Sequence, residues 1–79
     1  MSITFESGGE KTTYFDLDLA REEMAGRMPR FRVVRMAFRK FVGTSSMSIQ
    51  LETRSGRPWR ISANGTESVS FVCDLLDER

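Results

Sequence analysis

Residues 29–42 read PRFRVVRMAFRKFV, and the secondary structure of this stretch decides the fold. On a helix, which advances about 100° per residue, its apolar side chains gather in one half-turn: Phe31, Val33, Val34, Ala37, Phe38, Phe41 and Val42. On a strand, Arg35 and Arg39 would instead share a face with Val33. The pattern therefore predicts a helix over residues 29–42 that buries Phe38. A strand is the alternative, because valine and phenylalanine favour β-structure.

Two glycines earlier in the chain indicate a β-hairpin. Gly8-Gly9 can adopt the positive φ angles of a two-residue turn, with strands over residues 2–7 and 10–17. Closing the chain there opposes three pairs of residues: Glu6 and Lys11, Phe5 and Thr12, and Ile3 and Tyr14. This register predicts one apolar face and one face that carries an opposite-charge pair.

A short helix is expected over residues 19–27, between the hairpin and the stretch that decides the fold. Asp16 and Asp18 are both suited to accept a hydrogen bond from the backbone at its N-terminus. Gly26 is suited to end it, and Pro29 can begin the next helix because proline is tolerated in a first turn.

A second hairpin is predicted over residues 47–53 and 57–63. A three-residue loop, Arg54-Ser55-Gly56, opposes apolar residues across the strands: Trp59 and Leu51, Ile61 and Ile49, and Ala63 and Met47. A two-residue turn would oppose Trp59 to Glu52, so the three-residue loop is preferred. Pro58, on the other face, indicates an edge strand or a local irregularity.

A final helix follows the Asn64-Gly65 turn, with Thr66 as its expected cap. Its apolar face would carry Val69, Val72, Cys73, Leu75 and Leu76, with Phe71 at the margin. Taken together, the elements predict a small α+β single domain over residues 1–79. It would contain two antiparallel β-hairpins and three short helices, in the order ββααββα.

The chain has 79 residues, no histidine and one cysteine, and 39% of its residues are hydrophobic. This composition is typical of one small globular domain. Without histidine, and with Cys73 expected on the apolar helix face, zinc sites, Cys-His nucleophiles and histidine acid-base catalysis are excluded. We therefore expect a protein that is not an enzyme and that uses no cofactor and no metal.

The sequence has no signal-peptide core and no run of about 18 apolar residues that would span a bilayer. We therefore expect a cytoplasmic protein without a membrane partner. A domain of this size has a small core, so a homodimer is an open alternative for its stabilisation.

Charge is distributed unevenly along the chain, although the net charge is only +1. Residues 1–23 carry two basic and six acidic side chains, and residues 61–79 carry one basic and four acidic side chains. Residues 24–60 carry nine basic side chains against the single acid Glu52. The middle of the chain is therefore strongly basic and both ends are acidic.

The basic middle supplies the candidate binding residues: Arg32, Arg35, Arg39 and Lys40 on the expected helix, and Arg54, Arg57 and Arg60 at or near the second hairpin loop. Arginine binds phosphate and guanine edges through two parallel hydrogen bonds. These residues predict a small regulatory module that binds a polyanion, with nucleic acid as the first expectation. The layout of helix, turn, helix and hairpin is similar to a winged helix-turn-helix, although a hairpin replaces the usual first helix.

Two other interpretations of the basic residues stay open. The first is that they form the solvated face of an amphipathic helix, neutralised by acids of the other helices. The second is a protein-binding adaptor or inhibitor, for example a phage-encoded one, that docks on a partner protein or nucleoprotein complex. Either its arginines would contact an acidic protein surface, or its acidic ends would occupy a nucleic-acid site.

Overall fold

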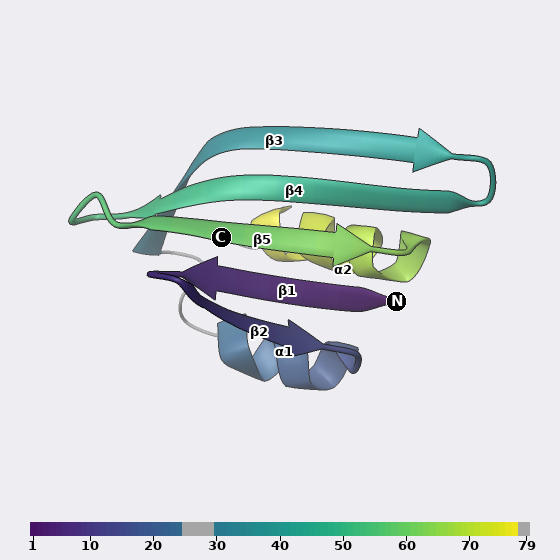
Figure 1. Ribbon diagram of the computed structural model, residues 1–79, viewed down its shortest axis with the longest axis horizontal. Coiled ribbons are helices and arrows are strands. Elements are labelled where there is room, and N and C mark those ends of the chain that lie inside the picture. The colour runs from purple at the N-terminus through teal and green to yellow at the C-terminus, as the bar shows by residue number, and fades with distance from the viewer. Residues whose placement is uncertain (25–29, 78–79) are drawn as a thin grey trace.

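The computed structural model describes residues 1–24 and 30–77, apart from the side chain of Phe41. It contains five strands and two helices within these residues: β1 (Ser2–Ser7), β2 (Glu10–Tyr14), α1 (Leu17–Met24), β3 (Phe31–Phe41), β4 (Thr44–Thr53), β5 (Pro58–Asn64) and α2 (Thr66–Asp77). The strands form one antiparallel sheet in the order β2-β1-β5-β4-β3 (Figure 1). The chain is thus an α+β domain, with the element order ββαβββα.

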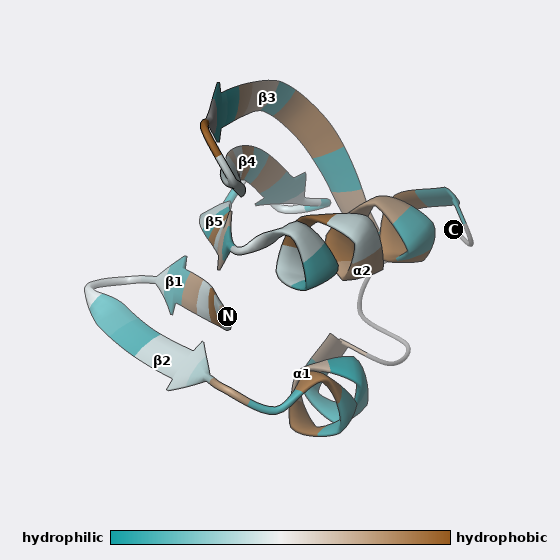
Figure 2. Ribbon diagram, turned by 90° about the vertical axis from the view of Figure 1, so that its right-hand side faces the viewer, coloured by the Kyte–Doolittle hydropathy of each residue, from teal (hydrophilic) through white to brown (hydrophobic). Residues whose placement is uncertain are grey.

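Both helices lie on one side of the sheet, as Figure 2 shows, and we call this side the helix face and the other the outer face. α2 packs on β4 and β5, and α1 lies beside β2. The core is formed between these layers by buried apolar side chains of the sheet and the helices: Ile3, Phe5, Met47, Ile49, Leu51, Ile61 and Ala63 from strands, Ala20 and Met24 from α1, and Phe71, Val72 and Leu75 from α2.

The structure confirms the predicted turns and registers of both hairpins, although the strand expected over residues 10–17 ends at Tyr14. Gly8 and Gly9 have φ angles of 61° and 84°, and Glu6 lies opposite Lys11. In the second hairpin, Gly56 has a φ of 83° and the pairs are those expected for a three-residue loop: Leu51 with Trp59, Ile49 with Ile61, and Met47 with Ala63. Glycine conformation and apolar alternation therefore determine both registers.

The predicted helix over residues 29–42 is wrong, because residues 31–41 form strand β3, which pairs with β4. Gly43, expected to end a helix, instead has a φ of 77° in the turn between the two strands. The described residues therefore contain two helices and not three. Long-range pairing with β4 decides the conformation of a segment in which helical periodicity and β propensity compete.

A β-bulge explains why this strand resembled a helix in sequence. The pairing shifts between Val33, which lies opposite Leu51, and Arg35, which lies opposite Gln50. Val33 packs against the core on the helix face, whereas Arg35 is exposed on the outer face. The additional residue, Val34, breaks the period of two that identifies a regular strand.

The expected burial of residues 29–42 is also wrong for Phe38, which is 58% exposed, and for Val42, which is fully exposed. Phe38 lies opposite Met47 on the helix face, but α2 packs on β4 and β5. The end of β3 near Val42 is therefore left beyond the helix layer.

Three smaller expectations are refined at the ends of elements. α1 begins at Leu17, and the amide of Asp18 donates a 2.8 Å hydrogen bond to Oδ1 of Asp16, which is the cap. The expected end of this helix at residues 26 and 27, and the expected start at Pro29, lie outside the described residues. Pro58 is the first residue of β5, which is an inner strand of the sheet and not an edge strand.

α2 begins at Thr66, one residue earlier than a Thr66 cap would require, and the Gly65 carbonyl accepts the amide of Val69 at 3.0 Å. Phe71, expected at the margin of its apolar face, is only 6% exposed. Cys73 is half-buried and packs against the core rather than lying fully within it. The helix therefore presents its predicted apolar face to the sheet, rotated toward Phe71.

Candidate polyanion-binding surface

The outer face of the sheet is polar along every strand. Its middle row consists of small residues that lie opposite one another in register: Ala37, Ser48, Ser62, Thr4 and Thr13. The hydroxyls of Thr4 and Thr13 are 2.9 Å apart and hydrogen bonded. The side chains in this row are short and project little from the sheet. A ligand can therefore approach the longer side chains in the rows beside it.

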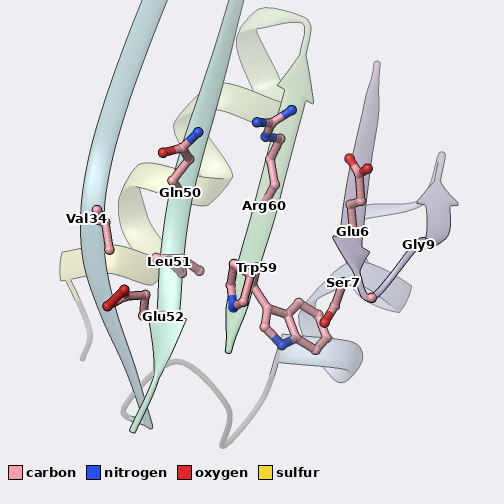
Figure 3. Close-up of a pocket in the computed structure, with 11 residues that line it drawn as sticks. Glu6, Ser7, Gly9, Val34, Gln50, Leu51, Glu52, Trp59 and Arg60 are labelled. Carbon is pink, nitrogen blue, oxygen red and sulfur yellow. The ribbon is translucent and has the colours of Figure 1, made fainter. Parts of the chain in front are cut away.

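The neighbouring row carries a charge on four of the five strands, with the neutral Gln50 on β4: Arg35, Gln50, Arg60, Glu6 and Lys11. Figure 3 shows the side chains of Gln50, Arg60 and Glu6 projecting from β4, β5 and β1 on the same side of the sheet, away from α2. Arg39 lies four residues beyond Arg35 on β3, opposite Ser46. The outer face therefore presents guanidinium groups from an edge strand and from an inner strand.

A hollow of about 370 Å³ lies beside this charged row, between the β-bulge and the first hairpin. Its polar lining includes Glu6, Gln50, Glu52 and Arg60, and Trp59 lies at its hairpin end (Figure 3). The two carboxylates make it unsuitable for a phosphate by itself. Anion binding on the outer face is therefore expected at the arginines beside the hollow.

Arg32 is partly neutralised within the chain. Its Nη2 donates a 2.6 Å hydrogen bond to Oε1 of Glu52, directly opposite on β4. The Arg32 side chain is 78% exposed, so the ion pair is solvated and contributes little to stability. Its consequence is electrostatic, since Glu52 reduces the positive potential at this end of β3.

The β4–β5 turn carries a second group of cations, Arg54 and Arg57, joined by Arg30, which directly precedes β3. The turn is held by the Gly56 amide, which donates to the Thr53 carbonyl at 2.9 Å. These arginines line a hollow of about 700 Å³ together with Phe31 and Trp59. The turn therefore combines cations with aromatic surface.

The aromatic part of this turn site was missed in the sequence. The rings of Phe31 and Trp59 have centroids 5.4 Å apart and a tilt of 49°. Both side chains are half-buried and pack against the core. The predicted register places Trp59 opposite Leu51, but the pairing of Phe31 with Trp59 depends on β3 being a strand.

The structure divides the predicted binding residues into three groups. Arg32, Arg35, Arg39 and Arg60 lie on the outer face, while Arg54 and Arg57 lie in the β4–β5 turn. Lys40 alternates with Arg39 and therefore lies on the opposite side of β3 from it. Lys40 is thus separated from the other cations. The predicted row of arginines along one face of a helix is wrong, because residues 31–41 form a strand. The resemblance to a winged helix-turn-helix is lost with that helix.

The helices carry acids on the other side of the sheet. Exposed acids on them include Asp18 and Glu22 of α1 and Glu67, Asp74 and Asp77 of α2. The sheet separates these carboxylates from the outer-face arginines. The acids of the helices are therefore separated in space from the outer-face arginines, whereas Glu6 and Glu52 lie among those arginines.

Among residues 1–24 and 30–77, no three histidine, cysteine, aspartate or glutamate side chains are arranged to hold a metal ion. Neither α1 nor α2, the helices in the described part of the chain, has the length and apolar character needed to cross a bilayer.

No family model, no curated protein and no solved structure matches the chain.

Proposed function

We propose that this chain is a small non-enzymatic module that binds nucleic acid through the outer face of its sheet and the β4–β5 turn. The observation that carries the proposal is the placement of Arg35, Arg39 and Arg60 on one helix-free face. Phosphate-binding cations are typically clustered on one side of a nucleic-acid-binding domain.

The spacing of these cations fits an extended ligand. Arg35 and Arg39 are four residues apart on β3, or about 13 Å at the usual rise per residue. Arg60 lies two strands away, or about 10 Å at the usual strand spacing. A nucleic-acid strand has one phosphate per about 3.4 Å of helix axis, so this area spans several phosphates.

The other groups of the surface are compatible with contacts to a sugar-phosphate backbone. Hydroxyl side chains such as Ser46, Ser48 and Ser62 can donate to phosphate oxygens, as serine and threonine often do in protein–DNA complexes. Arg54 and Arg57 extend the basic area beyond the end of the sheet. Such contacts position a nucleic acid without selecting a base sequence.

Fluorescence anisotropy with labelled duplex DNA, single-stranded DNA and duplex RNA at two salt concentrations tests this proposal. We expect binding to at least one of them, and its affinity should fall steeply with salt because phosphate contacts release counterions. The triple variant Arg35→Ser/Arg39→Ser/Arg60→Ser should lose at least tenfold in affinity, and the salt dependence should become shallower.

Arg21→Ser is the matched control, because it removes one cation from α1, on the other side of the sheet. It is compared with Arg60→Ser, which makes the same change in net charge. An equal loss in both variants would show that net charge alone drives binding. Absence of binding to all three nucleic acids at low salt would overturn the proposed function.

A further inference from the structure

β3 is an unusually long edge strand, and its two rows of side chains differ. It has 11 residues and forms one end of the sheet. A typical strand has about five or six residues, and a long exposed edge is a template for pairing with another chain. The composition of β3 therefore determines which chain could pair with it.

The helix-face row of β3 is apolar up to Phe38, is followed by Lys40, and is partly uncovered. Met36 lies opposite the buried Ile49, and Phe38 lies opposite the buried Met47. Their side chains are nevertheless 41% and 58% exposed, since α2 packs on β4 and β5. The core thus continues into the partly exposed side chains of Met36 and Phe38, which a further strand could cover.

The outer-face row of the same strand is cationic. Arg35 and Arg39 are exposed there, and the described ion pair of β3, between Arg32 and Glu52, involves neither of them. An added strand would place alternate side chains beside the Met36–Phe38 row and beside the Arg35–Arg39 row. Charge complementarity and hydrophobicity therefore both favour a strand in which apolar and acidic residues alternate.

A second copy of the chain fits this edge poorly. Residues 31–41 contain four basic side chains and no acid, so two β3 strands would bring eight cations together in any register. Like charges across a strand pair are destabilising, and such charges are a common protection against edge-to-edge association. The other edge, β2, has five residues and carries Glu10 beside Lys11, so it offers neither the length nor the charge.

We propose that the β3 edge binds an extended segment of a partner protein, with alternating acidic and apolar residues, as a sixth strand of the sheet. The backbone ladder would supply affinity, and the two side-chain rows would supply specificity, as in other cases of β-strand addition. This inference shares Arg35 and Arg39 with the proposed nucleic-acid site, but the apolar row and the backbone edge of β3 are not part of that site, so the two proposals can be tested separately.

A synthetic peptide tests the proposal directly. The probe is a fluorescein-labelled nine-residue peptide that alternates glutamate and valine, (Glu-Val)4-Glu. It is used at a concentration at which the free peptide is monomeric. Its control has the same composition with five glutamates followed by four valines. We expect the alternating peptide to bind at least tenfold more tightly than the control, since only the alternating peptide presents an acidic row and an apolar row together.

Protein variants locate the binding. Phe38→Ser and the double variant Arg35→Ser/Arg39→Ser should each weaken peptide binding at least fivefold, whereas Arg60→Ser, two strands from the edge, should leave it unchanged. Phe38, Arg35 and Arg39 are exposed, so the variants should keep the fold, which thermal denaturation checks. Arg60→Ser should weaken nucleic-acid binding, so the two proposals can fail separately.

Amide hydrogen exchange provides a second measurement. Peptide binding should protect the amides of β3 and leave those of β2 unchanged, because only the β3 edge gains a partner. Equal binding of the two peptides, or no effect of Phe38→Ser, would overturn the proposal. So would dimerisation of the protein alone with protection of β3, since the edge would then accept a second copy.

Discussion

Val33 and Arg35 are two residues apart on β3, yet they lie on opposite faces of the sheet. Val33 is opposite Leu51 and packs against the core, whereas Arg35 is opposite Gln50 and is exposed. Without the bulge, both would lie on the same face, and either a valine would be exposed or an arginine buried. The bulge thus allows one strand to complete the core and also to present arginines on the outer face.

Deletion of single residues in β3 tests this role of the bulge. Removal of Val34 makes Val33 and Arg35 consecutive, which suits their consecutive partners Leu51 and Gln50. We expect the melting temperature to fall by less than about 5 °C, since this corresponds to about 1 kcal/mol for a domain of this size.

Removal of Ala37 is the control. If the turn at Gly43 keeps its register, this deletion moves Arg35 to the position opposite the buried Ile49. A loss of more than about 10 °C is expected, since Phe31 and Val33 would lose their places against the core and Arg35 would take that of the partly exposed Met36. Equal losses from the two deletions would contradict the assigned bulge.

Alanine substitutions on neighbouring strands test which side chains form the core. Ile49→Ala should reduce the free energy of unfolding by about 2 to 5 kcal/mol, because Ile49 is completely buried in the central part of the sheet. Phe38→Ala removes a larger side chain but should cost less than about 1 kcal/mol, because Phe38 is mostly exposed.

Chemical denaturation of the two variants measures this difference. A loss for Phe38→Ala as large as that for Ile49→Ala would mean that Phe38 is buried in solution, as a helix over residues 29–42 would have required.

The hairpins could be predicted from the sequence because glycine turns and apolar alternation act over a few residues. Gly8-Gly9 and Gly56 fixed registers that the structure confirms. β3 could not be predicted in the same way. A single added residue at Val34 disrupts its alternation, and its pairing with β4 is a tertiary interaction that local propensity does not encode.

The residues of the candidate site could be predicted from the sequence, but their arrangement could not. Its arginines were identified by charge, which needs no secondary structure. Their grouping depends on the strand: Arg60 of β5 joins Arg35 in one row, while Lys40 is separated from Arg39 by the alternation of β3. The prediction of the turn site lacked its aromatic part, because the Phe31 side chain contacts Trp59 only when residue 31 is in a strand.

Gly65 combines a positive φ with a close contact, and the two effects can be measured separately. Its φ is 98°, and a Cβ there would lie 3.3 Å from the Cα of Met1. Gly43 has a similar φ of 77° with nothing within 4 Å of the same position. Gly43→Ala should therefore cost about 1 to 2 kcal/mol for the left-handed conformation alone.

Gly65→Ala should cost more than Gly43→Ala, since the first strand must shift to accommodate the methyl group. Denaturant unfolding of both variants gives the comparison. Equal costs would indicate that Met1 moves freely, and that the start of β1 is not held against the turn before α2.

The Arg32–Glu52 pair links the fold to the proposed nucleic-acid site. Glu52 is 31% exposed on the outer face and neutralises Arg32 at 2.6 Å. Glu52→Gln should change the free energy of unfolding by less than about 1 kcal/mol, as expected for a solvated ion pair. It should also strengthen nucleic-acid binding several-fold at low salt, because Arg32 then becomes available to a phosphate.

Glu67→Gln is the matched control for this prediction, because it makes the same change in net charge on α2, on the other side of the sheet. Anisotropy titrations at two salt concentrations should show a gain for Glu52→Gln that decreases at high salt, and a smaller gain for Glu67→Gln. If both variants gain equally, affinity follows the net charge of the domain, and the outer face has no special role. If Glu52→Gln weakens binding, Glu52 holds Arg32 in the orientation that contacts the ligand, and the two residues act as one unit of the site.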